Sequence, residues 1–253
     1  MTDLYPDLLK RCLINWIYGD KELAIRNVAG FQLATPAPMD EHNRVCGEDW
    51  PPTAHTMIGL KRLDNLEYCI NRVLHQGVPG DFIECGAWRG GASIFMRGLL
   101  KHNGVTTRRV FVADSFEGLP LPDARYPADA NDTHYQHGDV LAVSLEEVRE
   151  NFGRYGLLDD QVVFLKGWFK DTLPSAPITK LAILRIDGDM YESTTDALTN
   201  LYPKLSRGGF VIVDDYGVID GCRKATDDYR EQNGIKEPIV PIDRCGIFWR
   251  KLK

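Results

Sequence analysis

The segment DFIECGAWRGGASIFMRGLL, residues 81–100, decides the fold class of this protein. Residues 81–85 have the composition of a short buried strand, a glycine turn starts at Gly86, and residues 91–100 have the apolar spacing of a helix. Glycine at a strand end lets the backbone approach a ligand closely, and the following helix presents free N–H groups. The segment therefore predicts a strand, a tight turn and a helix, the opening unit of many ligand-binding α/β sheets.

Strand-like and helical stretches alternate along the rest of the chain. Strands are expected at 109–113, 161–166, 181–186 and 210–213, and helices at 145–155, 193–205 and 221–232. Short β-branched runs separated by helices are typical of parallel strands joined by crossovers. We therefore predict an α/β, Rossmann-like fold with a mostly parallel sheet, helices on both faces, and an antiparallel C-terminal edge pair from residues 239–242 and 246–250.

The N-terminal part has a different pattern. Apolar side chains at helical spacing predict helices at 4–18 and 57–74, whereas prolines interrupt residues 28–56, which we interpret as a loop or lid. Residues 1–75 are thus expected to form a helical and lid extension of a domain at residues 76–253, the two making one structural unit.

Composition excludes several classes of protein. The chain has 253 residues, 43% hydrophobic and 26% charged, which is enough for a large core. A formal charge of −6 argues against nucleic acid or an anionic membrane as a partner. The sequence has neither a run of roughly 20 apolar residues nor a secretory signal, and its six cysteines are scattered, so we expect a cytoplasmic protein with free thiols.

The glycine turn and the next strand together indicate a nucleoside site. The turn reads G-A-W-R-G-G from Gly86 to Gly91, so it lacks the second glycine with which dinucleotide sites admit a pyrophosphate. Asp114 ends the following strand, where an acid is placed to accept ribose hydroxyls. A nucleoside without phosphates fits best, and S-adenosylmethionine is the common one, although an ordinary turn of an unrelated sheet has the same glycines.

Four carboxylates follow two other strands. Asp187 and Asp189 come after one strand, and Asp214 and Asp215 come after another. Parallel strands end at one edge of a sheet, so these groups would repel one another unless a hard cation, Mg²⁺ first and Mn²⁺ or Ca²⁺ next, lies among them. Alternation along an extended stretch would place Asp187 and Asp189 on the same side. Such acids also serve as helix N-caps, but residues 193–194, Ser-Thr, already offer a cap.

With these motifs in view, the chain resembles the macrocin O-methyltransferase (TylF) family over nearly its whole length. Further segments that carry the resemblance are LYPDLLKRCLINWIY, GEDWPPTAHTMIGLKRLDNL, VADSFEGLP, NFGRYGLLDDQVVFLKGWFKDTLP, LRIDGDMYEST and GGFVIVDDY. The resemblance implies a class I methyltransferase fold and an S-adenosylmethionine- and Mg²⁺-dependent enzyme. Such an enzyme would methylate a deoxysugar hydroxyl, rhamnose-like, in bacterial antibiotic biosynthesis, and it would form a homo-oligomer through its N-terminal helices.

The resemblance also implies roles for individual residues. Asp187, Asp214 and Asp215 would ligate Mg²⁺, and Asp189 would be the general base. The residues implied to hold the cofactor are Thr56, Met57, Glu84, Gly86, Ala87, Trp88, Arg89, Asp114, Ser115, Gly167 and Trp168. Trp50 stands where the family has tyrosine and Cys245 where it has glutamine, and both are expected to face the acceptor.

Three other functions remain open on the residues alone. A catechol-type O-methyltransferase would use the same metal to hold an aromatic diol. A glycosyltransferase would use Asp187-Gly188-Asp189 as a DxD motif for a metal and a nucleotide sugar, although the glycine turn suits phosphates poorly. A binding module without activity would keep the nucleoside site and leave the carboxylates without a purpose. The sequence also leaves open whether the sugar is nucleotide-linked or on the finished scaffold.

Overall fold

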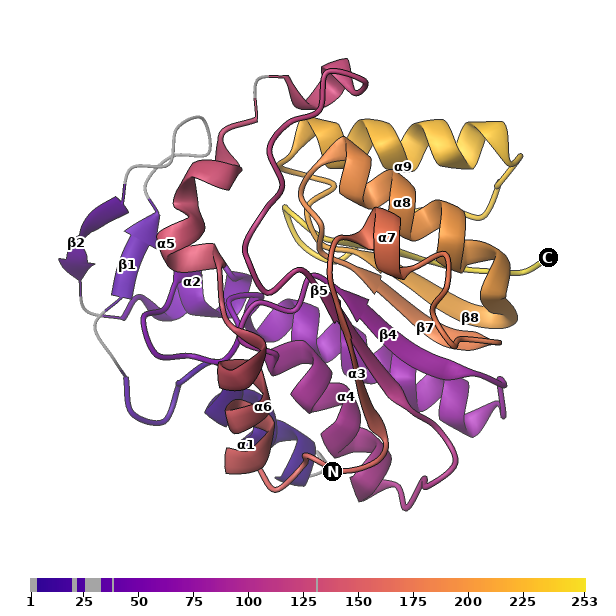
Figure 1. Cartoon of the computed structure of the whole chain (residues 1–253). Helices are drawn as coiled ribbons and strands as arrows, with labels where there is room; N and C mark the ends of the chain where they lie inside the picture. Colours follow the sequence, from indigo (N-terminus) through magenta and orange to yellow (C-terminus); the bar gives the residue numbers. More distant parts are fainter. Residues whose placement is uncertain (1–3, 20–21, 26–32, 38, 131) are drawn as a thin grey trace.

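A seven-stranded sheet lies at the centre of the part of the chain that the structure, a computed structural model, describes (Figure 1). The described residues are 4–19, 22–25, 33–37, 39–130 and 132–253. The strands have the order β6-β5-β4-β7-β8-β10-β9. Their bounds are β4 Asp81–Cys85, β5 Val110–Asp114, β6 Val162–Lys166, β7 Leu181–Ile186, β8 Leu205–Val213, β9 Val240–Pro241 and β10 Ile247–Arg250.

The pairing of these strands confirms the predicted topology. Strands β6, β5, β4, β7 and β8 run parallel, whereas β10 runs antiparallel to both β8 and β9. All six residues of β7 are buried, because a central parallel strand has a helical layer on each face. The mostly parallel sheet therefore directs the carboxyl ends of five strands to one edge, where α/β proteins bind ligands.

Helices cover both faces of the sheet. Phe82, Val110 and Ile212 point into a core shared with α1, α3, α4 and α6, while Ile83, Phe111 and Val211 point into a second core with α8 and α9. The helix bounds are α1 Leu4–Leu13, α3 Gly59–His75, α4 Gly91–His102, α5 Gly138–Leu141, α6 Leu145–Arg154, α7 Phe169–Thr172, α8 Tyr191–Leu201 and α9 Asp220–Gln232. Within the described residues, no helix is long and apolar enough to cross a membrane.

The prediction of a loop over residues 28–56 is wrong for residues 33–37, 41–46 and 49–50, which form regular elements, whereas residues 51–56 contain neither helix nor strand. Residues 26–32 and 38 lie outside the described part. Elsewhere the segment forms β2 Leu33–Ala37, α2 Glu41–Cys46 and β3 Asp49–Trp50, and its two strands pair with the preceding β1 Glu22–Ile25 in a three-stranded antiparallel sheet. These elements have two to six residues each, which is too short for a hydrophobic period to reveal them.

The first helix also ends earlier than predicted, at Leu13 instead of residue 18. The carbonyl of Leu13 accepts hydrogen bonds from the backbone N–H groups of His55, at 2.8 Å, and Thr56, at 3.3 Å. A carbonyl engaged by a distant segment marks where the helix gives way to a turn. This contact joins the N-terminal helix to the segment that precedes α3.

Candidate active site

A cavity of about 990 Å³ opens at the carboxyl ends of the parallel strands. It collects nearly all of the residues singled out from the sequence. Those that line it are Trp50, Thr56, Met57, Glu84, Gly86, Ala87, Trp88, Asp114, Ser115, Trp168, Asp187, Asp189, Asp214, Asp215 and Cys245. Arg89 and Gly167 are not among the lining residues, although both adjoin residues that are.

Gly86 brings two strands of the sheet together at the floor of the cavity. Its φ is 88°, and a Cβ there would lie 1.7 Å from the carbonyl oxygen of Asp187. The Gly86 N–H donates to the backbone carbonyl of Ala113, and the Asp187 N–H donates to the backbone carbonyl of Cys85, both at 2.8 Å. Glycine is therefore required both for the left-handed backbone and for the close approach of the chain that carries Asp187.

We expect Gly86→Ala to destabilise the protein by at least about 3 kcal/mol, because a methyl group must displace backbone atoms as well as adopt a left-handed conformation. Gly77→Ala is a matched control, since Gly77 has a φ of 62° but nothing within 4 Å of its Cβ position. That variant should lose only about 1–2 kcal/mol. Urea unfolding measures both values, and equal losses would contradict the role of the close approach.

Asp114 organises the glycine turn from the neighbouring strand. Its Oδ2 accepts the backbone N–H groups of Ala87, at 2.6 Å, and Trp88, at 3.3 Å, while its Oδ1 accepts that of Phe116, at 2.7 Å. Burial nevertheless raises the pKa of this carboxyl above its ordinary value. Much of its hydrogen-bonding capacity is thus used to hold the turn, and Asp114 also lines the cavity.

Arg89 fastens the N-terminal segment to the turn. Its Nη1 donates to the carbonyls of Pro51, at 3.1 Å, and Ala54, at 2.9 Å. The Gly91 N–H donates to the carbonyl of His55 at 2.9 Å. These bonds hold residues 51–56 over the start of α4 and place Thr56 and Met57 on the cavity wall.

Three carboxylates meet at the ends of β7 and β8. Asp187, Asp214 and Asp215 each offer an oxygen, and these oxygens all lie within 4.8 Å of one another. Burial and the charge of Asp214 raise the pKa of Asp187. Burial together with the charges of Asp189 and Asp187 raises the pKa of Asp215 well above its usual value. The cluster is therefore electrostatically strained, and a cation would relieve that strain.

The donor set fits a hard divalent cation. Among the described residues, Asp215 Oδ2 is buried and receives no hydrogen bond, which leaves a desolvated carboxylate oxygen without a partner. All three candidate ligands are carboxylates, the ligand type that Mg²⁺ and Mn²⁺ prefer over softer metals. The metal site stays a prediction, with Asp187, Asp214 and Asp215 as the residues that would hold the ion.

Asp189 lies beside this cluster in an unusual backbone conformation. Its φ is 56°, so it does not continue the extended alternation that we expected after β7, and that detail of the prediction is wrong. Both Asp187 and Asp189 still line the cavity. Burial, and next the charge of Asp187, raise the pKa of Asp189 to about 7. A carboxylate with this pKa is well matched to accept a proton near neutral pH.

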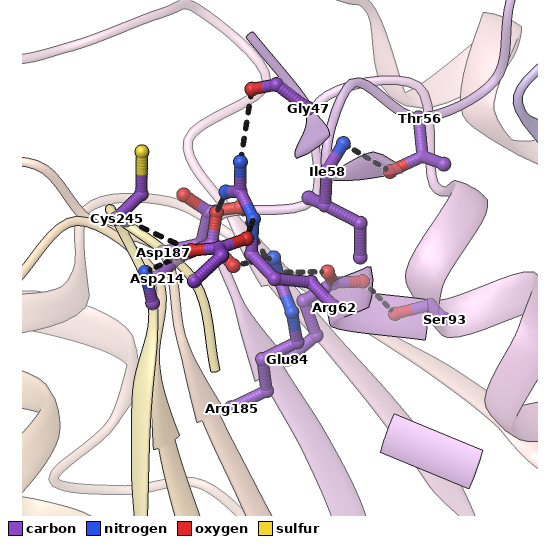
Figure 2. A network of polar contacts seen from close by, with 12 residues as sticks. Gly47, Thr56, Ile58, Arg62, Glu84, Ser93, Arg185, Asp187, Asp214 and Cys245 are labelled. Carbon is purple, nitrogen blue, oxygen red and sulfur yellow. Dashed lines mark hydrogen bonds and ion pairs between the residues drawn. The ribbon is translucent and has the colours of Figure 1, made fainter. Parts of the chain in front are cut away.

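Two buried arginines that the sequence analysis did not select neutralise part of the cluster (Figure 2). Arg185 donates from Nη1 to Glu84, at 2.7 Å, and to Asp187, at 2.9 Å, and from Nη2 to Asp214, at 2.6 Å. Arg62 donates to the other oxygen of Asp214. Arg185 therefore connects Glu84, which lines the cavity near the glycine turn, to two candidate metal ligands. A charged residue within the apolar run LAILRI was the signal for it.

The start of α8 differs from the prediction. The helix begins at Tyr191, and Ser193 lies inside its first turn and caps nothing. Instead, the carboxylate of Asp129 accepts the backbone N–H groups of Tyr191, at 2.6 Å, and Glu192, at 3.0 Å. This cap comes from a residue 62 positions away, which no local pattern reveals. Because Asp129 caps α8, Asp187 and Asp189 are not needed as caps for this helix, and both line the cavity.

The chain is similar over nearly its whole length to known O-methyltransferases. The model of the macrocin O-methyltransferase (TylF) family matches residues 2–251. An 8-demethyl-8-(2,3-dimethoxy-alpha-L-rhamnosyl)-tetracenomycin-C 4'-O-methyltransferase from Streptomyces olivaceus is 58% identical over 249 residues, which cover 98% of this chain and 92% of the relative. A mycinamicin III 3''-O-methyltransferase from Micromonospora griseorubida is 53% identical, covering 99% of this chain and 97% of the relative. The solved structure of the O-methyltransferase NovP aligns with a TM-score of 0.91 at 49% identity and covers 99% of both chains.

Proposed function

The chain belongs to the macrocin O-methyltransferase (TylF) family, and on that premise we propose that it methylates a deoxysugar hydroxyl in antibiotic biosynthesis, using S-adenosylmethionine and Mg²⁺. The observation that carries the proposal is the convergence of the glycine turn and the carboxylate cluster on one cavity. The S. olivaceus relative is named for a rhamnosyl substrate, which supports a rhamnose-like acceptor. Relatives named O-methyltransferases argue against the glycosyltransferase and the inactive binding module.

The metal would be held by Asp187, Asp214 and Asp215, the three residues whose oxygens converge. Bound S-adenosylmethionine supplies an electrophilic methyl group, and bound Mg²⁺ supplies the positive charge that lowers the pKa of an acceptor hydroxyl. Asp189 would accept the proton of the acceptor hydroxyl, whose oxygen takes the methyl group as the bond from that group to sulfur breaks and leaves S-adenosylhomocysteine. Asp189 lines the same cavity as the three candidate ligands, which supports its assignment as the base.

The cofactor would lie along the glycine turn. Ala87 and Trp88 line the cavity there, Asp114 holds their backbone, and Asp114 itself lines the cavity where a ribose would lie. Ser115 and Trp168 line the wall where the ends of β5 and β6 meet, which is where we place the adenine side. Orientation of the methyl group toward the acceptor oxygen is the main contribution expected of these residues.

The acceptor would bind between the N-terminal segment and the C-terminal turn. Trp50 comes from β3, and Cys245 comes from the turn between β9 and β10, yet both line the same cavity as Asp189. These residues differ from the family's tyrosine and glutamine, so we propose that they select this protein's particular sugar. The catechol-type alternative has no observation in its favour beyond the shared metal site.

A binding and turnover experiment tests the function. We expect calorimetry to detect S-adenosylhomocysteine binding, and a panel of rhamnosylated natural products and nucleotide-linked deoxysugars to include a substrate whose methylation stops in EDTA and resumes with Mg²⁺. Turnover that continues in EDTA would remove the carboxylates from the mechanism. Methylation of catechols but of no sugar would overturn the acceptor class.

The homo-oligomer and the cytoplasmic location stay predictions. The side chains of Leu4 and Leu8 on α1 are exposed by 76% and 48%, and Tyr18 beyond the helix is exposed by 85%. Exposed apolar residues gathered at one end of the chain support self-association through the N-terminal helix. Light scattering coupled to size-exclusion chromatography would measure the mass in solution, and a monomer would contradict this expectation.

A further inference from the structure

We propose that Arg62 is a positioning residue that clamps both walls of the acceptor site to the metal ligand Asp214. The proposal rests on the proposed metal site and assigns a role to a residue outside the ligand set. Arg62 belongs to α3, and its side chain is 6% exposed. Each of its three nitrogens donates in a different direction, to a different part of the chain (Figure 2).

One direction leads to the sheet edge. Arg62 Nη1 donates to Asp214 Oδ2, while Arg185 Nη2 donates to the other oxygen, Oδ1. The carboxylate of Asp214 is thus held through both oxygens, and one of them lies within 4.8 Å of an oxygen of Asp187 and of Asp215. Partners that orient a ligand in this way commonly tune metal affinity as strongly as the ligand geometry itself.

A second direction leads to the N-terminal wall. Arg62 Nη2 donates to the carbonyl of Gly47 at 3.0 Å. Gly47 ends α2 with a φ of 64°, and a Cβ there would lie 2.5 Å from the guanidinium, so only glycine lets the arginine approach. Gly47 and Glu48 line the cavity two to three residues before Trp50, which links this contact to the acceptor wall.

The third direction leads to the C-terminal wall. Arg62 Nε donates to Asp243 Oδ2 at 3.1 Å, across 181 positions of sequence. The other oxygen of Asp243 accepts the backbone N–H groups of Cys245, at 2.8 Å, and Gly246, at 2.7 Å, and so shapes the turn between β9 and β10. Arg62 therefore determines where Cys245 stands relative to Asp214.

Only a guanidinium has the geometry for all three contacts. Its planar fork presents donors in fixed directions, whereas a lysine ammonium on the same helix keeps the charge but acts as a single point. Binding a cation at Asp214 should restrain that carboxylate, and through Arg62 the restraint should reach Gly47 and the Cys245 turn. Metal loading would in this way order both walls before the acceptor binds.

The test compares Arg62→Lys with the wild type, because this substitution keeps the charge and removes the fork. We expect Mn²⁺ affinity, measured by electron paramagnetic resonance of the free ion, to fall about 10- to 100-fold. S-adenosylhomocysteine affinity should stay unchanged, since the hydrogen bonds of Arg62 lead to Asp214, Gly47 and Asp243 and not to the glycine turn. Hydrogen exchange should show that saturating Mg²⁺ protects the amides of Gly47 and Cys245 in the wild type but not in the variant.

Arg97→Lys is the matched control. Arg97 is also buried and forms a two-bond pair with Asp159, at 3.0 and 2.6 Å, but it lies outside the cavity lining. It should leave Mn²⁺ affinity and the metal-dependent protection unchanged. If Arg62→Lys does not fold, Asp243→Asn replaces it. That variant loses the acceptor for Arg62 Nε but keeps the oxygen that accepts the N–H groups of Cys245 and Gly246. It should also weaken Mn²⁺ binding.

The outcomes separate this inference from the proposed function. A wild type that does not bind Mn²⁺ would overturn the metal site and the clamp together. A wild type that binds Mn²⁺, with an Arg62→Lys variant that binds it equally and keeps the protection, would overturn the clamp alone. An Arg62→Lys variant with a lower melting temperature that loses S-adenosylhomocysteine affinity by the same factor as Mn²⁺ affinity would also overturn the clamp. Such a result would show that Arg62 only stabilises the fold.

Discussion

The Asp189→Asn variant is expected to lose methyl transfer by about 10²- to 10⁴-fold in kcat while binding S-adenosylhomocysteine as well as the wild type. Asparagine has the same shape as aspartate but cannot accept a proton at this position. The left-handed backbone at residue 189 tolerates asparagine well, so folding should be preserved. Single-turnover kinetics with a sugar acceptor, combined with calorimetry, measures both quantities.

A control separates loss of the base from a general loss of negative charge. Asp220 follows the second carboxylate motif in sequence, but its side chain is 97% exposed at the start of α9. Asp220→Asn should therefore retain wild-type turnover. If Asp189→Asn retained turnover as well, the base would have to be another group, and the assignment of Asp189 would be wrong.

The second large effect is expected at Asp215, where function and stability should change in opposite directions. Its Oδ2 is buried without a hydrogen bond from the described residues, and burial with three neighbouring carboxylates raises its pKa. Asp215→Asn replaces a carboxyl whose ionisation these neighbours oppose with an amide that cannot ionise. Without metal, the variant should be more stable than the wild type by about 1 kcal/mol, as is usual when a strained active site is relieved.

With metal, the order should reverse. A ligand that binds only the folded protein stabilises it by about 2.7 kcal/mol at 100 times its Kd, so Mg²⁺ should raise the melting temperature of the wild type. Asp215→Asn should show little of this increase, and its turnover should fall about a thousandfold, corresponding to several kcal/mol of lost transition-state stabilisation. Thermal unfolding with and without Mg²⁺ measures the reversal. A variant with the full Mg²⁺ response would show that Asp215 is not a ligand.

Much of the fold could be predicted from local patterns in the sequence. The strands at 81–85 and 181–186 were predicted to the residue, because a strand buried on both faces is a continuous apolar run bounded by turn residues. The glycine turn was equally visible, since a strand, glycines and a helix follow one another within twenty positions. Where strands are short and paired only with each other, as in the small sheet of β1, β2 and β3, no such run exists, and the prediction of a loop was wrong for β2 and β3.

The candidate site followed the same division. The carboxylates at 187, 189, 214 and 215 were identified because parallel strands all end at one edge of the sheet. Residues that directly follow such strands in the sequence therefore lie close together in the fold. The roles of Asp129, Arg185 and Arg62 were not identified. Each of these residues acts through partners far away along the chain, such as Asp243, 181 positions from Arg62, and a local pattern contains no record of such a partner.

The sequence by itself thus determined the parallel sheet, the glycine turn and the collection of acids at its edge, because these depend on neighbours within a few residues. Only the tertiary structure decided how those acids are charged and held. Burial raises the pKa of Asp189 to about 7, and Arg185 and Arg62 share the carboxylate of Asp214 between them. Desolvation and ion pairing depend on what the folded chain packs around a group, so they arise only when distant segments meet.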